Sequence, residues 1–144
     1  MFAAWAGVRL IKEHEWEYAC RANIREGDPD SGPLSENFWK GDPKREKLED
    51  HAWIDKNSKG RTWPVDAKKD GSHTNPFGLV DMLGNVDEWT EDLYEVGQVS
   101  RVLRGGSFNR YGRYASASFR RLYDPSCAYI YFGFRVARAP EGKS

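Results

Sequence analysis

Short alternating runs of apolar and polar residues dominate the last third of the chain. One run at residues 101–104 leads into Gly105-Gly106, and a second run at residues 132–136 closes the region. Between them stands Asp124-Pro125, a dipeptide that typically interrupts regular structure. The pattern predicts two strands that bracket a series of shorter strands and turns.

The helical signal of the chain lies in residues 1–21. The segment 13–20 places Trp16 and Cys20 four positions apart, on one face of a helix. We expect a short helical piece before it, ending at Gly7. Residues 22–76 carry no clear periodicity and are expected to be irregular. Within them we expect a Gly- and Pro-rich loop, an aromatic anchor, a solvated charge run and a turn, at residues 27–33, 37–39, 44–50 and 57–60.

Tyrosine is concentrated in the same C-terminal region. Five of the seven tyrosines fall between positions 111 and 131, among Ser, Gly, Ala, Asn and Arg. Binding surfaces use this mixture, because Tyr offers a large contact area at little cost in conformational entropy. The alternative is that the tyrosines are half-buried strand residues. Their number, outside any clear alternation, favours a surface.

Oxygen-bearing side chains gather in the Gly-punctuated segment 75–94, at Asp81, Asn85, Asp87 and Glu88. Calcium prefers carboxylates and backbone carbonyls held by a tight turn. Asp81 and Glu88, with carbonyls of the 84–86 turn, are candidates for such a site. The spacing is not that of an EF-hand, and spacing alone favours a capped turn with surface acids.

Composition bounds the class of protein. A length of 144 residues indicates one domain, and 39% hydrophobic residues with six Trp and seven Phe suffice for a core. No apolar run is long enough for a membrane span, and residues 1–5 show neither a basic leader nor a cleavage pattern. A cytoplasmic location is the default expectation. Cys20 and Cys127 lack metal-ligand spacing, and the three scattered histidines (His14, His51 and His73) do not predict a metal triad.

The net charge of zero conceals an asymmetry. Residues 101–144 carry nine basic and two acidic side chains, a balance of +7, so residues 1–100 carry −7. A basic face would suit an anionic partner such as nucleic acid. The alternative, which we favour, is that the arginines pair with acids of the same domain, because Arg suits fixed bidentate pairs.

Four motifs together resemble the formylglycine-generating enzyme, or sulfatase-modifying factor, domain. They are RLIKEHEWEYACRA, NPFGLVDMLGNVDEW, RVLRGGSF and GFRVAR, at residues 9–22, 75–89, 101–108 and 133–138. The resemblance implies an α+β protein of C-type-lectin-like fold, with a small antiparallel sheet, two helices and a high loop content. It implies a single domain over residues 1–144 that lacks the family's N-terminal portion.

The family's functional positions differ here in one decisive respect. The enzymes carry two reactive cysteines after the Gly-Gly-Ser-Phe motif, and these positions correspond to Arg110 and Ala115. Without thiolates no copper site and no thiol redox chemistry are expected. Ile11-Lys12 also replaces a Pro-Thr pair, which removes a helix-capping hydroxyl. The resemblance further implies a structural calcium site, at Asp81, Gly84, Val86 and Glu88.

The chain is closer in character to variable proteins of diversity-generating retroelements, which resemble this domain. Their adenine-directed mutagenesis of AAC or AAT codons cannot produce Lys, Glu, Gln, Met or Trp. None of these five types occurs between Ser107 and Arg135, although they make up 29 of the 144 residues. An absence over this length is not expected by chance.

These observations predict a non-catalytic protein that presents a diversified face to a ligand. The expected ligand is a protein, and nucleic acid is not expected. Phe108, Phe132 and Phe134 are assigned to the supporting scaffold. The alternatives are an oxidase of the formylglycine-generating type or a degenerate relative of it, and a structural or regulatory module. The candidate ligand-binding residues are Asn109, Arg110, Tyr111, Tyr114, Ser116, Arg121, Tyr123, Ser126, Ala128, Tyr129, Ile130 and Tyr131.

Overall fold

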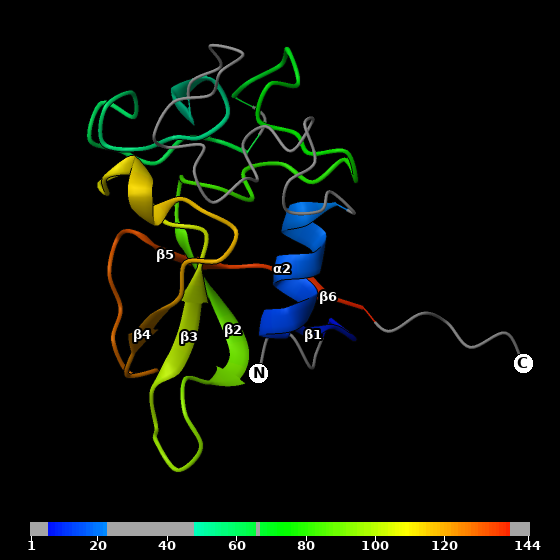
Figure 1. The fold of residues 1–144 in the computed structure, drawn as a ribbon, viewed down its shortest axis with the longest axis vertical. Helices are drawn as coiled ribbons and strands as arrows, with labels where there is room; N and C mark the ends of the chain where they lie inside the picture. Colours follow the sequence, from blue (N-terminus) through cyan, green and yellow to red (C-terminus); the bar gives the residue numbers. More distant parts are fainter. Residues whose placement is uncertain (1–5, 23–47, 66, 139–144) are drawn as a thin grey trace, which may run out of the picture.

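The computed structural model describes residues 6–22, 48–65 and 67–138 (Figure 1). It has an α+β architecture in which short strands and one α-helix are joined by long loops. The elements in chain order are β1 (Arg9–Leu10), α2 (Glu13–Arg21), the 3-10 helix η3 (Leu48–Asp50), β2 (Asp87–Leu93), β3 (Arg101–Arg104), the 3-10 helix η4 (Gly112–Tyr114), β4 (Arg121–Tyr123), β5 (Phe132–Phe134) and β6 (Val136–Ala137). Three of the expected features lie outside the described residues, wholly or in part. They are the loop at 27–33, the aromatic anchor at 37–39 and residues 44–47 of the charge run.

The main sheet has four strands in the order β4-β3-β2-β5. β3 pairs antiparallel with both neighbours, as expected, but β5 pairs parallel with β2. The sheet is therefore mostly antiparallel, with one parallel pairing at the β5 edge. β4 and β5 run in the same direction at opposite edges, so residues 124–131 must return along the sheet before β5 begins (Figure 1).

The helix α2 begins and ends where its sequence predicts. The Glu15 carboxylate accepts a hydrogen bond from the Lys12 backbone N–H at 2.9 Å, the half of a capping box that does not need the missing hydroxyl. At the other end, the N–H of Ala22 donates to the carbonyl of Tyr18. The expected helical piece that ends at Gly7 lies mostly outside the described residues. Within the region 1–21 that carries the helical signal, Arg9–Leu10 is instead a strand, which pairs antiparallel with the distant β6.

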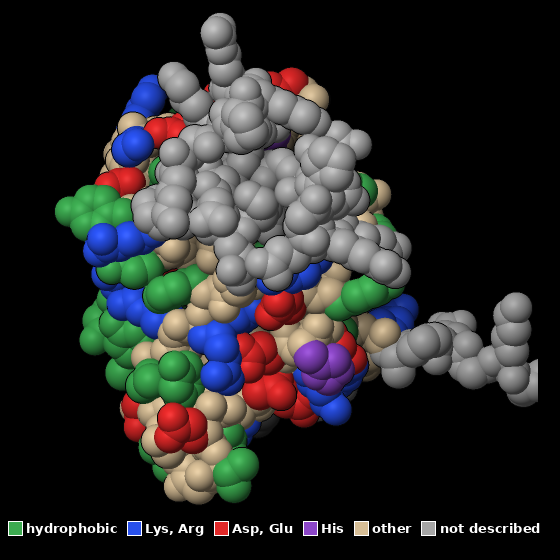
Figure 2. All heavy atoms as spheres, viewed as in Figure 1, with side chains coloured by type: hydrophobic (Ala, Val, Ile, Leu, Met, Phe, Trp, Pro, Cys, Tyr) green, Lys and Arg blue, Asp and Glu red, His purple; other side chains and the backbone are tan. Residues whose placement is uncertain are grey.

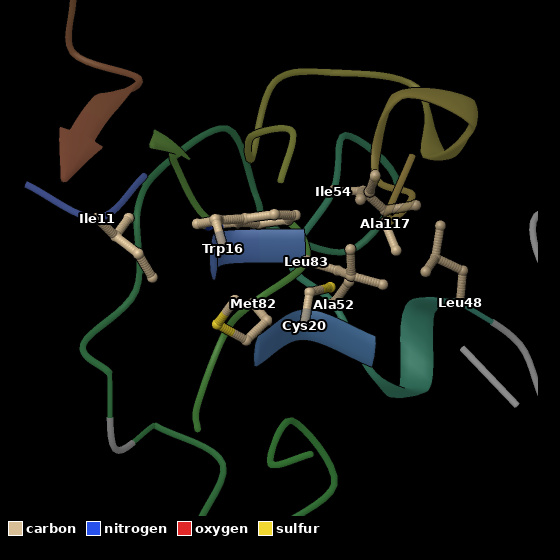
Figure 3. Close-up of a cluster of buried hydrophobic side chains, with 10 residues drawn as sticks. Ile11, Trp16, Cys20, Leu48, Ala52, Ile54, Met82, Leu83 and Ala117 are labelled. Atoms are coloured by element: carbon tan, nitrogen blue, oxygen red, sulfur yellow. The ribbon is translucent and has the colours of Figure 1, made fainter. Parts of the chain in front are cut away.

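The core forms where α2 packs against β2, β3 and the loops around Ala52 and Leu83 (Figure 3). Trp16 and Cys20 are fully buried on the predicted face of the helix. The indole N–H of Trp16 donates to Glu88 Oε2 at 2.7 Å. A Cβ on Gly105, which has φ +94°, would lie only 3.2 Å from the Trp16 ring, so this close approach of β3 to the helix requires glycine. The charge run at 44–50 was expected to be solvated, but its Leu48 is buried in the core.

A fully buried arginine joins the helix to the sheet and to the loop that precedes β4. Arg104, the last residue of β3, places its guanidinium 2.6 Å from Glu17 and 3.4 Å from Glu13, over the Trp16 ring. The same guanidinium donates to three consecutive backbone carbonyls, of residues 117, 118 and 119. These bonds fix the loop 117–119 against α2.

Four of the eight arginines at positions 101–138 pair with acids of residues 1–100, as the favoured interpretation of the charge asymmetry expects. Besides Arg104, these are Arg120 with Glu13, Arg121 with Asp87, and Arg135 with Glu88. Among the described residues, no helix combines the length and the apolar character that crossing a bilayer demands.

The change Arg104→Met is expected to destabilise the fold by about 3–5 kcal/mol, because it removes a fully buried charge and leaves three backbone carbonyls and two partly buried carboxylates without their donor. The matched control is Arg120→Met. Arg120 shares Glu13 but its side chain is 41% exposed, and exposed pairs contribute about 0–1 kcal/mol. Urea denaturation measures both free energies of unfolding, and equal losses would show that Arg104 is not the anchor of this fold.

Candidate ligand-binding face

The predicted ligand-binding residues gather on one side of the molecule, and all but one are at least partly exposed. The exception is Ser116, which is buried and whose Oγ accepts a hydrogen bond from the Phe119 backbone N–H, so its assignment to the surface was wrong. The remaining eleven form what we call the binding face. Figure 2 shows hydrophobic and basic side chains interleaved along the left edge of the molecule, over the yellow and orange segments of Figure 1.

An aromatic cluster forms the part of the binding face around β5. The rings of Tyr123, Tyr129 and Tyr131 surround Phe132, with centroid separations of 4.9, 5.2 and 5.0 Å. Tyr129 and Tyr131 also stack on each other at 5.1 Å with nearly parallel planes. Beneath them, Phe132 meets Trp89 of β2 edge-on. The tyrosines therefore support one another while remaining at the surface, with Tyr129 47% exposed.

Arginines lie over the tyrosine rings of the face. The guanidinium of Arg110 lies 5.2 Å from the Tyr131 ring, and that of Arg121 lies 4.9 Å from the Tyr123 ring. Arg113 in η4 lies 4.7 Å from the ring of Tyr114. Such cation–π contacts orient both partners and leave the guanidinium N–H groups available for further hydrogen bonds.

A buried carboxylate lies under this part of the face. Asp87, the first residue of β2, is 3.3 Å from Arg121 Nη1 and 3.1 Å from Ser107 Oγ. Burial raises the pKa of Asp87 above its ordinary value, and Arg121, Ser107 and Arg110 oppose that rise. The sequence suggested Asp87 only as an oxygen donor, and the structure makes it the counter-ion of the arginines.

The rest of the face consists of turns. The Asp124 carboxylate accepts hydrogen bonds from the backbone N–H and hydroxyl of Ser126, which closes the turn after β4. Ala128 and Ile130 in the return segment are exposed, the latter by 81%. Asn109 is also exposed, beside the buried Ser107.

The three scaffold phenylalanines have different environments. Phe108 is 3% exposed and is held through its backbone, whose carbonyl accepts from Ser58 Oγ at 2.8 Å. Phe132 is half-buried under the tyrosines. The assignment of Phe134 to the core was wrong, because it lies in the edge strand β5 with 57% of its surface exposed. There it borders a cavity of about 380 Å³ together with Leu10, Trp89, Thr90, Glu91, Arg101 and Pro125.

One residue of the face escaped the sequence analysis. Phe119 packs on the Tyr114 ring at 5.0 Å and closes a small cavity between Arg110 and Arg121. No periodic pattern marks it, since the segment 115–120 is irregular. Its position depends on the carbonyl groups that Arg104 holds.

No thiol stands at either position that corresponds to a reactive cysteine. Arg110 is half-buried and Ala115 is buried in the core. The two cysteines of the chain are free, and burial raises the pKa of the Cys20 thiol to about 12. Cys127 is partly exposed in the turn after β4.

The candidate calcium ligands lie in a tight turn beside α2. Asp81, Gly84 and Asn85 all have positive φ, and the Asp81 carboxylate contacts His73 Nδ1 at 2.9 Å and Asn85 Nδ2 at 3.2 Å. The Glu88 carboxylate accepts three hydrogen bonds, two from Arg135 and one from Trp16. Within the described residues, no group of three or more His, Cys, Asp or Glu side chains converges as a metal site.

Comparison with known proteins assigns the family. Residues 1–140 match the model of the sulfatase-modifying factor enzyme 1-like domain. The inactive C-alpha-formylglycine-generating enzyme 2 of Mus musculus is 38% identical over 115 residues, covering 74% of this chain and 33% of that protein. The formylglycine-generating enzyme of Mycobacterium tuberculosis is 39% identical over 95 residues, covering 62% and 28%. This chain thus spans about a third of the length of these relatives.

A solved structure supports the resemblance to variable proteins. Treponema denticola variable protein 1 superposes with a TM-score of 0.73 and 30% identity, covering 92% of this chain and 48% of that one. The fold is therefore the C-type-lectin-like fold of the formylglycine-generating type. By sequence and by structure, the chain belongs to the family of sulfatase-modifying factor enzyme 1-like domains.

Proposed function

We propose that this domain is a non-catalytic ligand-binding module that presents a diversified binding face on a fixed scaffold. The observation that carries the proposal is the set of exposed tyrosines and arginines between positions 109 and 131, held on ordered turns. Aromatic and arginine side chains dominate binding energy at protein interfaces, so a protein is the ligand that suits this face best. The match to a variable protein supports diversification of the same segment.

An oxidase of the formylglycine-generating type is the second candidate, because one relative carries that name and another is named inactive. Thiol oxidation needs an accessible thiolate. Arg110 and Ala115 cannot provide one, and the buried Cys20 is protonated at neutral pH. These residues support binding over catalysis.

We also propose calcium as a structural ligand of the Asp81–Glu88 turn. A carboxylate offers about four lone-pair positions. Asp81 uses two of them and Glu88 uses three, so both keep an acceptor position for a hard cation. The Gly84 and Val86 carbonyls would complete the oxygen set, and calcium would hold this turn against α2.

The double variant Tyr111→Ser/Tyr129→Ser is expected to lose capture of a protein ligand from a lysate of the source organism, measured by mass spectrometry. Because Tyr111 is 63% exposed and Tyr129 47%, each single change should cost only about 0.5–1 kcal/mol of stability. The matched control is Tyr18→Ser, which removes a 60% exposed tyrosine from α2 and should leave capture unchanged. Phe108→Ala should instead cost about 3–5 kcal/mol. Capture that survives the double variant would contradict the proposal.

No oxidation of a cysteine-containing sulfatase peptide is expected, with or without copper, because neither Arg110 nor Ala115 supplies a thiolate. Mass spectrometry of the peptide measures this, with an active formylglycine-generating enzyme as the positive control. Turnover abolished by Cys127→Ser would restore the oxidase hypothesis. Turnover that persists in the Cys20→Ser/Cys127→Ser double variant would reveal a chemistry that uses neither thiol.

Millimolar calcium is expected to raise the melting temperature relative to a chelator, because a ligand that binds only the native state stabilises it by mass action. Asp81→Asn should abolish the rise. Asp124→Asn makes the same chemical change at an exposed turn and serves as the control. A melting temperature that is the same in both conditions would leave Asp81 and Glu88 as structural acids only.

A further inference from the structure

A small cavity lies within the binding face. Its volume is about 150 Å³, and its lining residues are Arg110, Tyr114, Phe119 and Arg121. A cavity of this size suits a single side chain. We call it the arginine cavity.

The charge of the arginine cavity is incompletely neutralised. Among the described residues, Arg104, Arg120 and Arg135 each pair with at least one carboxylate, whereas Arg110 pairs with none. Arg121 pairs only with Asp87, and the charge of Arg110 also lowers the pKa of that carboxyl. Two guanidinium groups thus share one buried carboxylate, and an excess positive charge remains in the cavity wall.

The Arg110 side chain makes no hydrogen bond to any of the described residues. Its Nε is fully buried, so only the two Nη groups can face the cavity. The guanidinium is nevertheless held in place. The Arg110 backbone donates to Ser107 and accepts from Asp55, and its guanidinium lies over the Tyr131 ring. The donor is therefore preorganised rather than collapsed onto the protein.

We infer that the arginine cavity binds the carboxylate of an Asp or Glu side chain of a protein ligand. This inference rests on the proposed function and specifies what the face recognises. Arginine matches a carboxylate with two parallel N–H donors, and such charge-assisted bonds are among the strongest in proteins. The rings of Tyr114 and Phe119 exclude water from the bonds, which strengthens them.

Nucleic acid fits the same positive charge less well. The arginine cavity is small and has only two arginines in its wall, whereas nucleic-acid sites follow a backbone with a row of basic residues. The paired arginines are unavailable for such a row, and the exposed Asp124 lies on the same side of the molecule. An acidic protein segment with apolar neighbours suits the combination of one cavity and surrounding tyrosines.

The test begins with random peptides displayed on phage, selected on the intact chain. Enrichment of Asp or Glu is expected, and the leading peptide is then synthesised with its acid and with the matching amide. Isothermal titration should show the acid form binding about thirtyfold or more tightly, the effect typical of a lost partner in a buried charge pair. This comparison changes only the peptide, so it does not depend on any variant folding.

Variants then locate the carboxylate. Arg110→Gln should weaken binding of the acid peptide by about thirtyfold and leave the amide peptide nearly unaffected. Arg61→Gln is the matched control, because Arg61 also lies over an aromatic ring and lacks a carboxylate partner among the described residues, but it belongs neither to the cavity nor to the binding face. It should change the affinity by less than about threefold, as charge changes outside the contact do.

The outcomes separate the two proposals. Peptide binding that survives Tyr111→Ser/Tyr129→Ser would overturn the binding face itself. Binding that needs these tyrosines but ignores both Arg110→Gln and the acid-to-amide change would overturn the arginine cavity alone. A single-stranded DNA oligonucleotide that binds more tightly than the acid peptide, and requires Arg110, would overturn the assignment to a protein ligand.

Discussion

The buried guanidinium of Arg104 is the interaction on which the rest of this structure depends. It ends β3, pairs with Glu13 and Glu17 of α2, and donates to three consecutive carbonyls of the loop 117–119. An irregular loop normally satisfies its backbone with water. Here one side chain satisfies three carbonyls at once, so a loop of small residues can pack on the core without forming a helix or strand. The position of Phe119, and with it the wall of the arginine cavity, follows from these bonds.

Arginine has two separate roles in this chain. Arg104, Arg120 and Arg135 neutralise acids that lie more than forty positions away in sequence, and they hold the helix, the turn and the sheet together. Arg110, Arg113 and Arg121 lie instead over tyrosine rings, with one carboxylate among them. The first group stabilises the fold, and the second gives the binding face its positive charge. The two groups meet at Phe119, which Arg104 holds through its carbonyl, and at Asp87, which pairs with Arg121.

The contacts that hold the scaffold together are largely separate from the binding face. The scaffold needs Trp16, Glu88 and Arg135 at the junction of α2, β2 and the residue after β5, and these contacts do not involve the face. The face needs only that the segment from 109 to 131 begin and end at fixed strands. At the two positions where the resemblance places thiols, this chain has Arg110 and Ala115, and Ala115 packs within the core.

The sequence alone determined the local features: α2 with its buried Trp16 and Cys20, the strands on either side of the face, and the tyrosine-rich segment between them. Periodicity and turn residues act over a few positions, so a pattern in the sequence suffices to predict them. Only the tertiary structure made Arg9–Leu10 a strand, paired β5 parallel to β2, buried Ser116 and exposed Phe134. It also decided which arginines are neutralised, because a pair such as Arg120 with Glu13 joins residues 107 positions apart, and no local pattern carries that information.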